Sequence, residues 1–195
     1  MSEAIRSFIA VPMPAETVEK LMAVQTQLRP AARNVKWVSA DSLHVTLKFL
    51  GVVEPARLHQ TWESVQEALA ETKRFTLLVR GVGAFPSRTR VRVIWAGIEQ
   101  GTGALAEMTH SIEGTCQQHG FEPESRPFQA HITMGRVREP VVNQELAQKM
   151  EEFAQEQFGE VNVDRVLLMK SELTPKGAHY TVLEQHLLTA PETSK

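Results

Sequence analysis

The stretch HVTLKFLG, residues 44–51, alternates polar and apolar side chains along its first six positions. Successive side chains of a β-strand point to opposite faces, so a strand here would place the histidine, threonine and lysine on one face and the valine, leucine and phenylalanine on the other. One face would pack into a core and the other would stay polar. Taken alone, this pattern predicts an ordinary half-exposed strand.

A second copy of the pattern changes this interpretation. HITM, residues 131–134, repeats HVTL, residues 44–47, nearly half the chain further on, and strands predicted near Val91 and Ala178 follow their histidines at the same distance. This duplication predicts an α+β fold with pseudo-two-fold symmetry. We expect residues 1–195 to form one two-lobed domain, in which each lobe is an antiparallel sheet with helices packed outside and the cleft lies between the lobes.

Apolar spacing predicts the remaining elements. Residues three and four positions apart repeat through four segments, which indicates four amphipathic helices near residues 18–28, 58–69, 105–116 and 142–153. Runs rich in β-branched and aromatic residues predict strands near residues 8–12, 75–85, 91–98, 162–173 and 178–188. Helices and strands are therefore interspersed along the whole chain, with two pairs of consecutive strands.

Bulk composition excludes several classes of protein. The 195 residues carry a net charge of −2, which argues against a broad binding surface for duplex DNA. The one cysteine, Cys116, excludes an internal disulfide and a thiolate zinc cluster, and its helical spacing predicts a buried thiol. The apolar run FIAVP, residues 8–12, is too short for a signal peptide, and no segment reaches the length of a membrane span. We therefore expect a monomer in the cytoplasm with no membrane contact.

Two histidines on symmetry-related strands suit general acid and base catalysis of phosphodiester cleavage. One imidazole takes a proton from the attacking oxygen while the other gives a proton to the leaving oxygen, and an ordinary pKa near ~6.5 populates both forms around neutral pH. Thr46 and Thr133, each two residues after a histidine, would present hydroxyls to a phosphate held between His44 and His131. This chemistry needs no metal and no cofactor.

These motifs, together with WVSADSLHVTLKFLG, RVRVIWAGI and FQAHITMGRV around them, resemble the two-histidine phosphoesterase superfamily, and within it the RNA 2′,3′-cyclic phosphodiesterases, also called 2′-5′ RNA ligases. The resemblance extends from FIAVPMP to GAHYTVLEQHLL. It implies a bilobal fold, hydrolysis of 2′,3′-cyclic phosphate ends of RNA to 2′-phosphomonoesters without a metal, and a reversible 2′-5′ RNA ligase activity. It also implies the roles of His44 as proton donor to the leaving 3′ oxygen and His131 as proton acceptor from water.

Further polar and aromatic residues are candidates for the site. Arg136 has the wrong strand parity relative to His131, but a bulge at Gly135, or an end of the strand there, would turn its guanidinium toward the phosphate. The family often has arginine at this point, and the alternative is a surface salt bridge. Lys48 shares the parity of His44 and would raise the local potential, or be solvated at the strand end. One aromatic residue is expected to stack on a base, and the candidates are Phe8, Phe49, Phe85, Trp95 and Phe128, of which Phe128, just before the second motif, is preferred.

Other clusters have two interpretations or none. Arg88, Arg90 and Arg92 form either a patch that tracks RNA or an edge that discourages aggregation. The remaining histidines show no spacing typical of metal ligands, and no glycine-rich phosphate loop is present, so we predict no metal site and no nucleoside triphosphate site.

Two other functions stay open. One is a non-catalytic module that binds RNA ends, against which the presence of both histidines argues. The other is a related two-histidine phosphodiesterase that acts on 2′-5′ linked oligonucleotides or small cyclic nucleotides, which the sequence does not distinguish from the leading hypothesis.

Overall fold

The computed structural model describes residues 3–139, 142–174 and 177–190. The strands are β1 (Ile5–Pro12), β2 (Val35–Trp37), β3 (His44–Val53), β4 (Phe75–Pro86), β5 (Val91–Gln100), β6 (His131–Val137), β7 (Gln157–Val163), β8 (Arg165–Thr174) and β9 (Gly177–Leu187). The helices are α1 (Ala15–Leu28), α2 (Pro55–Ala68), α3 (Thr102–Gln118) and α4 (Gln144–Glu152), with short 3₁₀ turns at Arg29–Ala31 and Ala40–Ser42. The predicted helices and strands are confirmed with two exceptions. The sequence pattern did not indicate the short strand β2, and the single strand predicted near residues 162–173 is divided at Asp164 between the end of β7 and β8.

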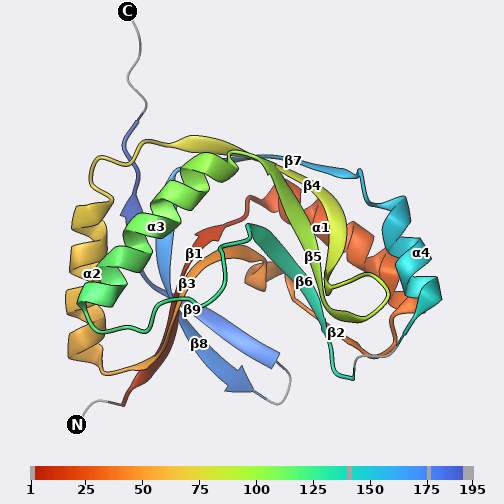
Figure 1. Cartoon of the computed structure of the whole chain (residues 1–195), viewed down its shortest axis with the longest axis horizontal. Helices are drawn as coiled ribbons and strands as arrows, with labels where there is room; N and C mark the ends of the chain where they lie inside the picture. The colour runs from red at the N-terminus through yellow and green to blue at the C-terminus, as the bar shows by residue number, and fades with distance from the viewer. Residues whose placement is uncertain (1–2, 140–141, 175–176, 191–195) are drawn as a thin grey trace, which may run out of the picture.

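One curled antiparallel sheet runs through the molecule in the order β7-β4-β5-β6-β3-β1-β8-β9, with β2 paired to the far end of β6 (Figure 1). The two strands that carry the histidines, β3 and β6, are neighbours at its centre and pair at Val45 and Ile132, the residues that follow the two histidines. The pseudo-two-fold axis therefore passes between these two residues. The predicted α+β duplication is confirmed, and the strands of the two lobes join edge to edge in one sheet.

The two lobes are not the two halves of the chain. The first lobe takes β1 and β3 from the N-terminal half and the β8–β9 hairpin from the C-terminal half, while β6 and β7 of the second lobe flank the β4–β5 hairpin from the N-terminal half. The lobes thus exchange hairpins. Because neither lobe is built from a continuous half of the chain, the cleft strands are held in place by segments from both halves.

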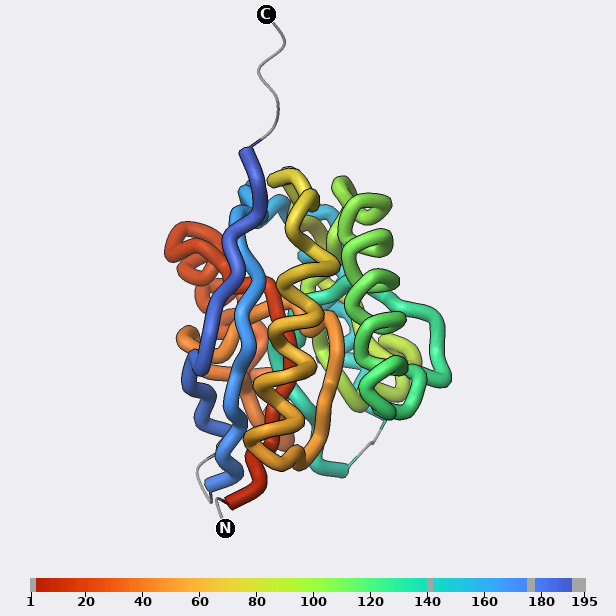
Figure 2. Tube along the Cα trace, turned by 90° about the vertical axis from the view of Figure 1, so that its left-hand side faces the viewer, coloured from red at the N-terminus to blue at the C-terminus, as the bar shows by residue number. Residues whose placement is uncertain are grey.

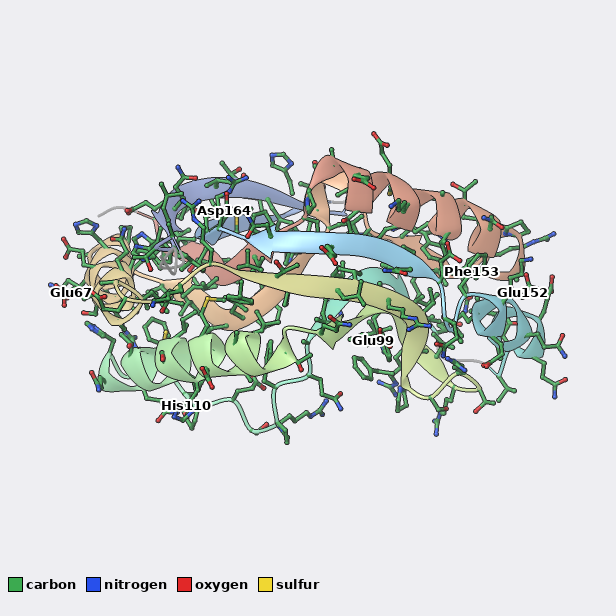
Figure 3. The ribbon with its side chains drawn as sticks, turned by 90° about the horizontal axis from the view of Figure 1, so that it is seen from above. Glu67, Glu99, His110, Glu152, Phe153 and Asp164 are labelled. Carbon is green, nitrogen blue, oxygen red and sulfur yellow. The ribbon has the colours of Figure 1, made fainter. Side chains whose placement is uncertain are left out.

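Helices cover the outer, convex face of the sheet. Helices α2 and α3 pack against each other beside the first lobe (Figure 2), where α3 contacts β3, while α1 contacts β7 and α4 contacts β4 in the second lobe. Seen from above, α2, with Glu67, and α4, with Glu152, lie at opposite ends of the molecule (Figure 3). No helix in the described ranges combines the length and the apolar character that crossing a membrane requires.

The core lies between the helices and the convex face of the sheet, and one apolar cluster runs through both lobes. Cys116 belongs to this cluster, where burial raises the pKa of its thiol to about 11, so the prediction of a buried thiol is confirmed. A second, smaller cluster of Phe8, Ala10, Leu167 and Met169, with Tyr180 against it, lies separately from the first. Phe8 and Tyr180 of this cluster both contact the ring of His44, so the cluster forms an apolar support for the cleft.

Candidate active site

The two histidines are held in the same way on their two strands. His131 Nδ1 lies 2.7 Å from the carbonyl oxygen of Gln129, and the ring of His44 is hydrogen-bonded to the backbone of Ser42. In both cases the backbone partner is two residues before the histidine. A ring N–H that donates to a carbonyl fixes the tautomer and leaves Nε2 available for proton transfer. In the first lobe Nε2 of His44 lies 3.1 Å from the hydroxyl of Thr46.

Two hollows meet between these strands. One, of about 630 Å³, is bordered by His44, Tyr180, Lys36 and Arg6, and we call it the His44 hollow. The other, of about 1010 Å³, is bordered by His131, Phe85, Phe128 and Arg92, and we call it the His131 hollow. Both are of the size that encloses small ligands in proteins.

Four residues border both hollows and mark their junction: Thr46, Thr133, Phe49 and Arg136. The structure therefore brings together five of the six residues predicted for the site, namely both histidines, both threonines and Arg136. Phe128 lies to one side, half-buried against the main core along the His131 hollow.

A β-bulge at the same place in each motif decides which side chains reach this junction. The register of β3 against β1 skips Leu47, and that of β6 against β5 skips Met134, each three residues after the histidine. A bulge inserts one extra residue and so reverses the alternation beyond it. Phe49 is consequently 57% exposed and Arg136 is also exposed, while Lys48 is buried.

The prediction of a bulge that turns Arg136 to the cleft is confirmed, although the skipped residue is Met134 and not Gly135. The prediction that Lys48 shares a face with His44 and the phenylalanine the opposite one is wrong. The sequence carries no signal for the bulge in β3, because its register is set by pairing with β1, a strand more than 30 residues away in the chain. Strand parity therefore placed Phe49, although it was a candidate for stacking on a base, on the packed face and not in the cleft.

Different contacts hold the two bulges. In β6 the carbonyl of Met134 accepts hydrogen bonds from the backbone N–H of Val38 at 2.9 Å and from the buried side chain of Gln25 at 3.1 Å. Gly135 faces β2, where a Cβ would lie 2.7 Å from a methyl group of Val35, so a larger residue does not fit without movement.

In β3 the ammonium of Lys48 turns toward α3. It donates to a carboxylate oxygen of Glu113 at 2.9 Å and to the backbone carbonyl of Glu122 at 2.8 Å. The same carboxylate oxygen accepts the backbone N–H of Glu124. Lys48 is thus part of a buried ionic contact that ties β3 to the segment before β6, and it is not a solvated residue at a strand end.

Aromatic walls remove water from both imidazoles to different degrees. The ring of His44 stacks on Phe8 with centroids 4.9 Å apart and meets the edge of Tyr180 at 5.4 Å, while His131 meets only Phe85 among the described aromatic rings, at 5.1 Å. Burial, with a smaller contribution from the positive charges of Arg136 and His131, lowers the pKa of His44 to about 4, although the hydrogen bond to the Ser42 backbone opposes this shift. Burial, and then Arg136, also lowers the pKa of His131.

The side chains of Arg88, Arg90 and Arg92, predicted as one patch, lie in different surroundings. Arg88 is paired with Glu151 and donates to the carbonyl of Val82, so its charge is already satisfied. Arg90 lies at the surface outside both hollows, whereas Arg92 borders the His131 hollow. The three side chains do not form one continuous track. Within the described ranges, no group of three or more histidine, cysteine or acidic side chains is arranged to hold a metal ion.

A curled duplicated sheet that presents paired histidines, threonines and an arginine defines a phosphoesterase of the two-histidine class. The family model described as LigT like Phosphoesterase matches residues 11–95 and 97–180, and each stretch contains one of the two histidines. The chain belongs to this family.

Particular relatives agree with this assignment. The chain is 33% identical to the RNA 2′,3′-cyclic phosphodiesterase of Methanothermobacter thermautotrophicus over 92% of this chain and 97% of the relative. A crystal structure from Thermus thermophilus matches with a TM-score of 0.79 and 30% identity, covering 96% of this chain and all of the other. Escherichia coli LigT complexed with 3′-AMP also matches with a TM-score of 0.79, at 26% identity over 96% of this chain and 99% of that one.

Proposed function

We propose that this protein is an RNA 2′,3′-cyclic phosphodiesterase that opens 2′,3′-cyclic phosphate ends to 2′-phosphomonoesters by acid and base catalysis between two histidines. The observation that carries the proposal is the junction of the hollows, where both threonines and Arg136 lie beside two imidazoles that are each hydrogen-bonded to the backbone two residues earlier. The relatives named as RNA 2′,3′-cyclic phosphodiesterases and the 3′-AMP bound to Escherichia coli LigT support the same substrate class.

In this mechanism the cyclic phosphate lies at the junction. Arg136 offers a planar fork of N–H donors to two phosphate oxygens, and the hydroxyls of Thr46 and Thr133 donate to others. These groups would stabilise the charge that builds up on the phosphoryl oxygens as the phosphorus becomes five-coordinate. Thr46 would then exchange its present contact with His44 for a phosphate oxygen.

Proton transfer balances across the two imidazoles. His131 Nε2 takes a proton from water as the water oxygen bonds to phosphorus, and His44 Nε2 gives a proton to the 3′ oxygen as its bond to phosphorus breaks. The phosphate stays on the 2′ oxygen, and exchange with solvent restores both histidines. With a 5′ hydroxyl in place of water, the same forward steps would form a 2′-5′ linkage: His131 takes the proton of that hydroxyl as its oxygen bonds to phosphorus, and His44 protonates the 3′ oxygen as its bond breaks.

Because the pKa of both histidines is lowered in the free protein, the proton donor has to take up its proton when the substrate binds. At neutral pH a His44 with a pKa of about 4 is neutral in the free protein. A phosphate anion at the junction opposes the charge of Arg136 and favours the imidazolium form, so binding should raise the pKa of both histidines. His131 has fewer aromatic neighbours than His44, so the alternative is the reversed assignment, in which His131 is the proton donor.

Phe49 is the best placed aromatic residue for the base. It is the most exposed of the large aromatic side chains near the histidines, and it borders both hollows. Stacking of a base on an aromatic ring contributes roughly 1–3 kcal/mol and tolerates any base. We therefore assign base stacking to Phe49 and leave Phe128 as a wall of the His131 hollow.

The test is to digest 2′,3′-cyclic AMP in the presence of EDTA and to separate the products by chromatography against 2′-AMP and 3′-AMP. We expect 2′-AMP with unchanged rate under chelation. A product that is mainly 3′-AMP would reverse the roles of His44 and His131, and activity that needs an added divalent ion would contradict the two-histidine mechanism. We further expect a monomer that acts in the cytoplasm, and size-exclusion chromatography with light scattering tests the first of these.

A further inference from the structure

Two cations face each other across neighbouring strands beside the catalytic junction. In the pairing of β2 with β6, Lys36 lies directly opposite Arg136, and both side chains are exposed and border the His44 hollow. Like charges at directly opposed positions of a sheet destabilise it. Because this pair of cations does not stabilise the sheet, we interpret it as part of a binding site next to the active site.

No acidic side chain relieves this repulsion within the described ranges. Among the described residues that border the His44 hollow, three are cationic (Arg6, Lys36 and Arg136) and none is acidic. None of these three has an ion-pair partner in the part of the chain that the structure describes. Some cations elsewhere do, such as Arg80 with Glu99 and Lys48 with Glu113. The His131 hollow differs, because Glu113 and Glu124 border it together with its cations.

The ligand that this arrangement fits carries more than one negative charge along its length. Neighbouring strands are roughly 4.8 Å apart, so Lys36 lies one strand further along the hollow than Arg136. If Arg136 binds the terminal cyclic phosphate, Lys36 is left without an anion by a cyclic mononucleotide, which has a single phosphate. An RNA strand has a second phosphate on the 5′ side of its last nucleotide.

The proposed roles of the histidines give the direction of the strand. His44 protonates the 3′ oxygen, which stays on the ribose, so the ribose and the nucleotides before it lie on the His44 side. Water, or a second strand, approaches from the His131 side. The cationic hollow is thus on the side where the RNA chain continues.

We propose that Lys36, with Arg6, binds the phosphates on the 5′ side of the terminal nucleotide, and that the preferred substrate is therefore the end of an RNA strand and not a cyclic mononucleotide. This inference rests on the proposed function and adds its polymer specificity. It also replaces the arginine patch at residues 88–92 as the surface that follows the RNA.

The experiment compares three substrates: 2′,3′-cyclic AMP, a dinucleotide with a 2′,3′-cyclic end and a 2′-O-methylated first residue, and the same dinucleotide with an uncharged methylphosphonate linkage. The wild type should prefer the charged dinucleotide over the mononucleotide by about tenfold in kcat/KM, the size of one charge-assisted hydrogen bond. The methylphosphonate should lose this preference.

In Lys36→Ala the ratio of kcat/KM for dinucleotide to mononucleotide should fall about tenfold, and the methylphosphonate should cause no further loss, because both changes remove the same contact. The slope of log kcat/KM against log salt concentration for the dinucleotide should become shallower by roughly 0.7, the value for one phosphate contact on a single strand. Lys20→Ala, which removes a cation on α1 that pairs with Glu16, is the matched control and should leave both measures unchanged.

Three results would overturn the inference. Equal losses on the mononucleotide and dinucleotide would place Lys36 at the terminal phosphate, and no loss on either would leave it without a role. A loss confined to 2′-5′ ligation with a 5′-hydroxyl acceptor would assign it to a second strand. Failure of the wild type to hydrolyse any of the three substrates would instead contradict the proposed function itself.

Discussion

The strands β3 and β6 carry the same motif and the same bulge but differ in the residues beyond the bulge. Five residues after its histidine, β3 presents the exposed ring of Phe49, and β6 presents the guanidinium of Arg136. Just before these, β3 buries Lys48 against Glu113, whereas β6 has Gly135 packed under β2. Two symmetry-related strands thus place an apolar aromatic ring on one side of the cleft and a positive charge on the other.

This difference explains how a symmetric cleft can bind an asymmetric substrate. The two His-x-Thr arms are nearly equivalent for a phosphate, so only unlike neighbours distinguish its ring oxygens. The aromatic wall of Phe8 and Tyr180 is one such neighbour, because it helps to bury His44, whose pKa falls to about 4. The binding of an asymmetric substrate therefore depends on the positions at which the two halves of the duplication carry different residues.

The largest effect should come from removing either arm. His44→Ala and His131→Ala should each lower kcat by at least ~10²-fold, because each removes one partner in proton transfer. Both imidazoles border the cleft, so the far-ultraviolet circular dichroism spectrum should stay that of the wild type. Near-normal turnover in either folded variant would show that the two arms do not share the chemistry as proposed.

The unequal burial of the arms predicts a pH dependence of stability. A folded pKa of about 4 for His44, below the ordinary ~6.5, means that the unfolded chain binds this proton more readily between these two values. The free energy of unfolding should therefore fall as pH drops from ~6.5 to ~4, by up to about 3 kcal/mol from this group. Above pH ~6.5 this group should cause no further change of stability with pH.

Urea unfolding at pH 7, 5 and 4 measures this dependence, and His44→Gln should make it smaller. In NMR titrations His44 should titrate below its ordinary range, and added phosphate should raise the midpoints of both histidines. Midpoints near ~6.5 for both rings in the free protein would remove the proposed link between substrate binding and proton uptake.

Arg136→Gln tests whether the guanidinium on β6 binds the phosphate. We expect kcat/KM to fall about 30-fold, in line with the ~2 kcal/mol of a charge-assisted hydrogen bond, and Arg136→Lys to recover only part of it because the fork geometry is lost. The same change removes a positive charge that lowers both histidine pKa values, so the acidic limb of the pH–rate profile should move upward. An unmoved limb would indicate that Arg136 does not face the histidines in solution.

The smallest effect should come from the apolar side. Phe49→Ala should raise KM about fivefold with little change in kcat, because stacking of ~1 kcal/mol is made equally in the bound and transition states. Phe49→Trp should restore binding, and Phe128→Ala serves as the comparison from the neighbouring wall. If Phe128→Ala raises KM more than Phe49→Ala does, the sequence-based assignment of Phe128 as the stacking residue is the better one.

Sequence by itself determined the duplication, the α+β class and the six polar and aromatic candidates, because periodicity and repeated motifs are local properties. His44, Thr46, His131 and Thr133 precede the bulges, so simple alternation placed them correctly. Arg136 was recovered because Gly135 and the family pattern pointed to an irregular strand.

Only the tertiary structure decided what lies beyond the bulges and which halves of the chain meet. The outward turn of Phe49, the burial of Lys48 and the position of Lys36 opposite Arg136 all result from pairing between strands that are distant in the chain. Register in a sheet is a property of two strands at once, and a shift of one residue moves every later side chain to the other face. The order of residues along one strand does not contain that information.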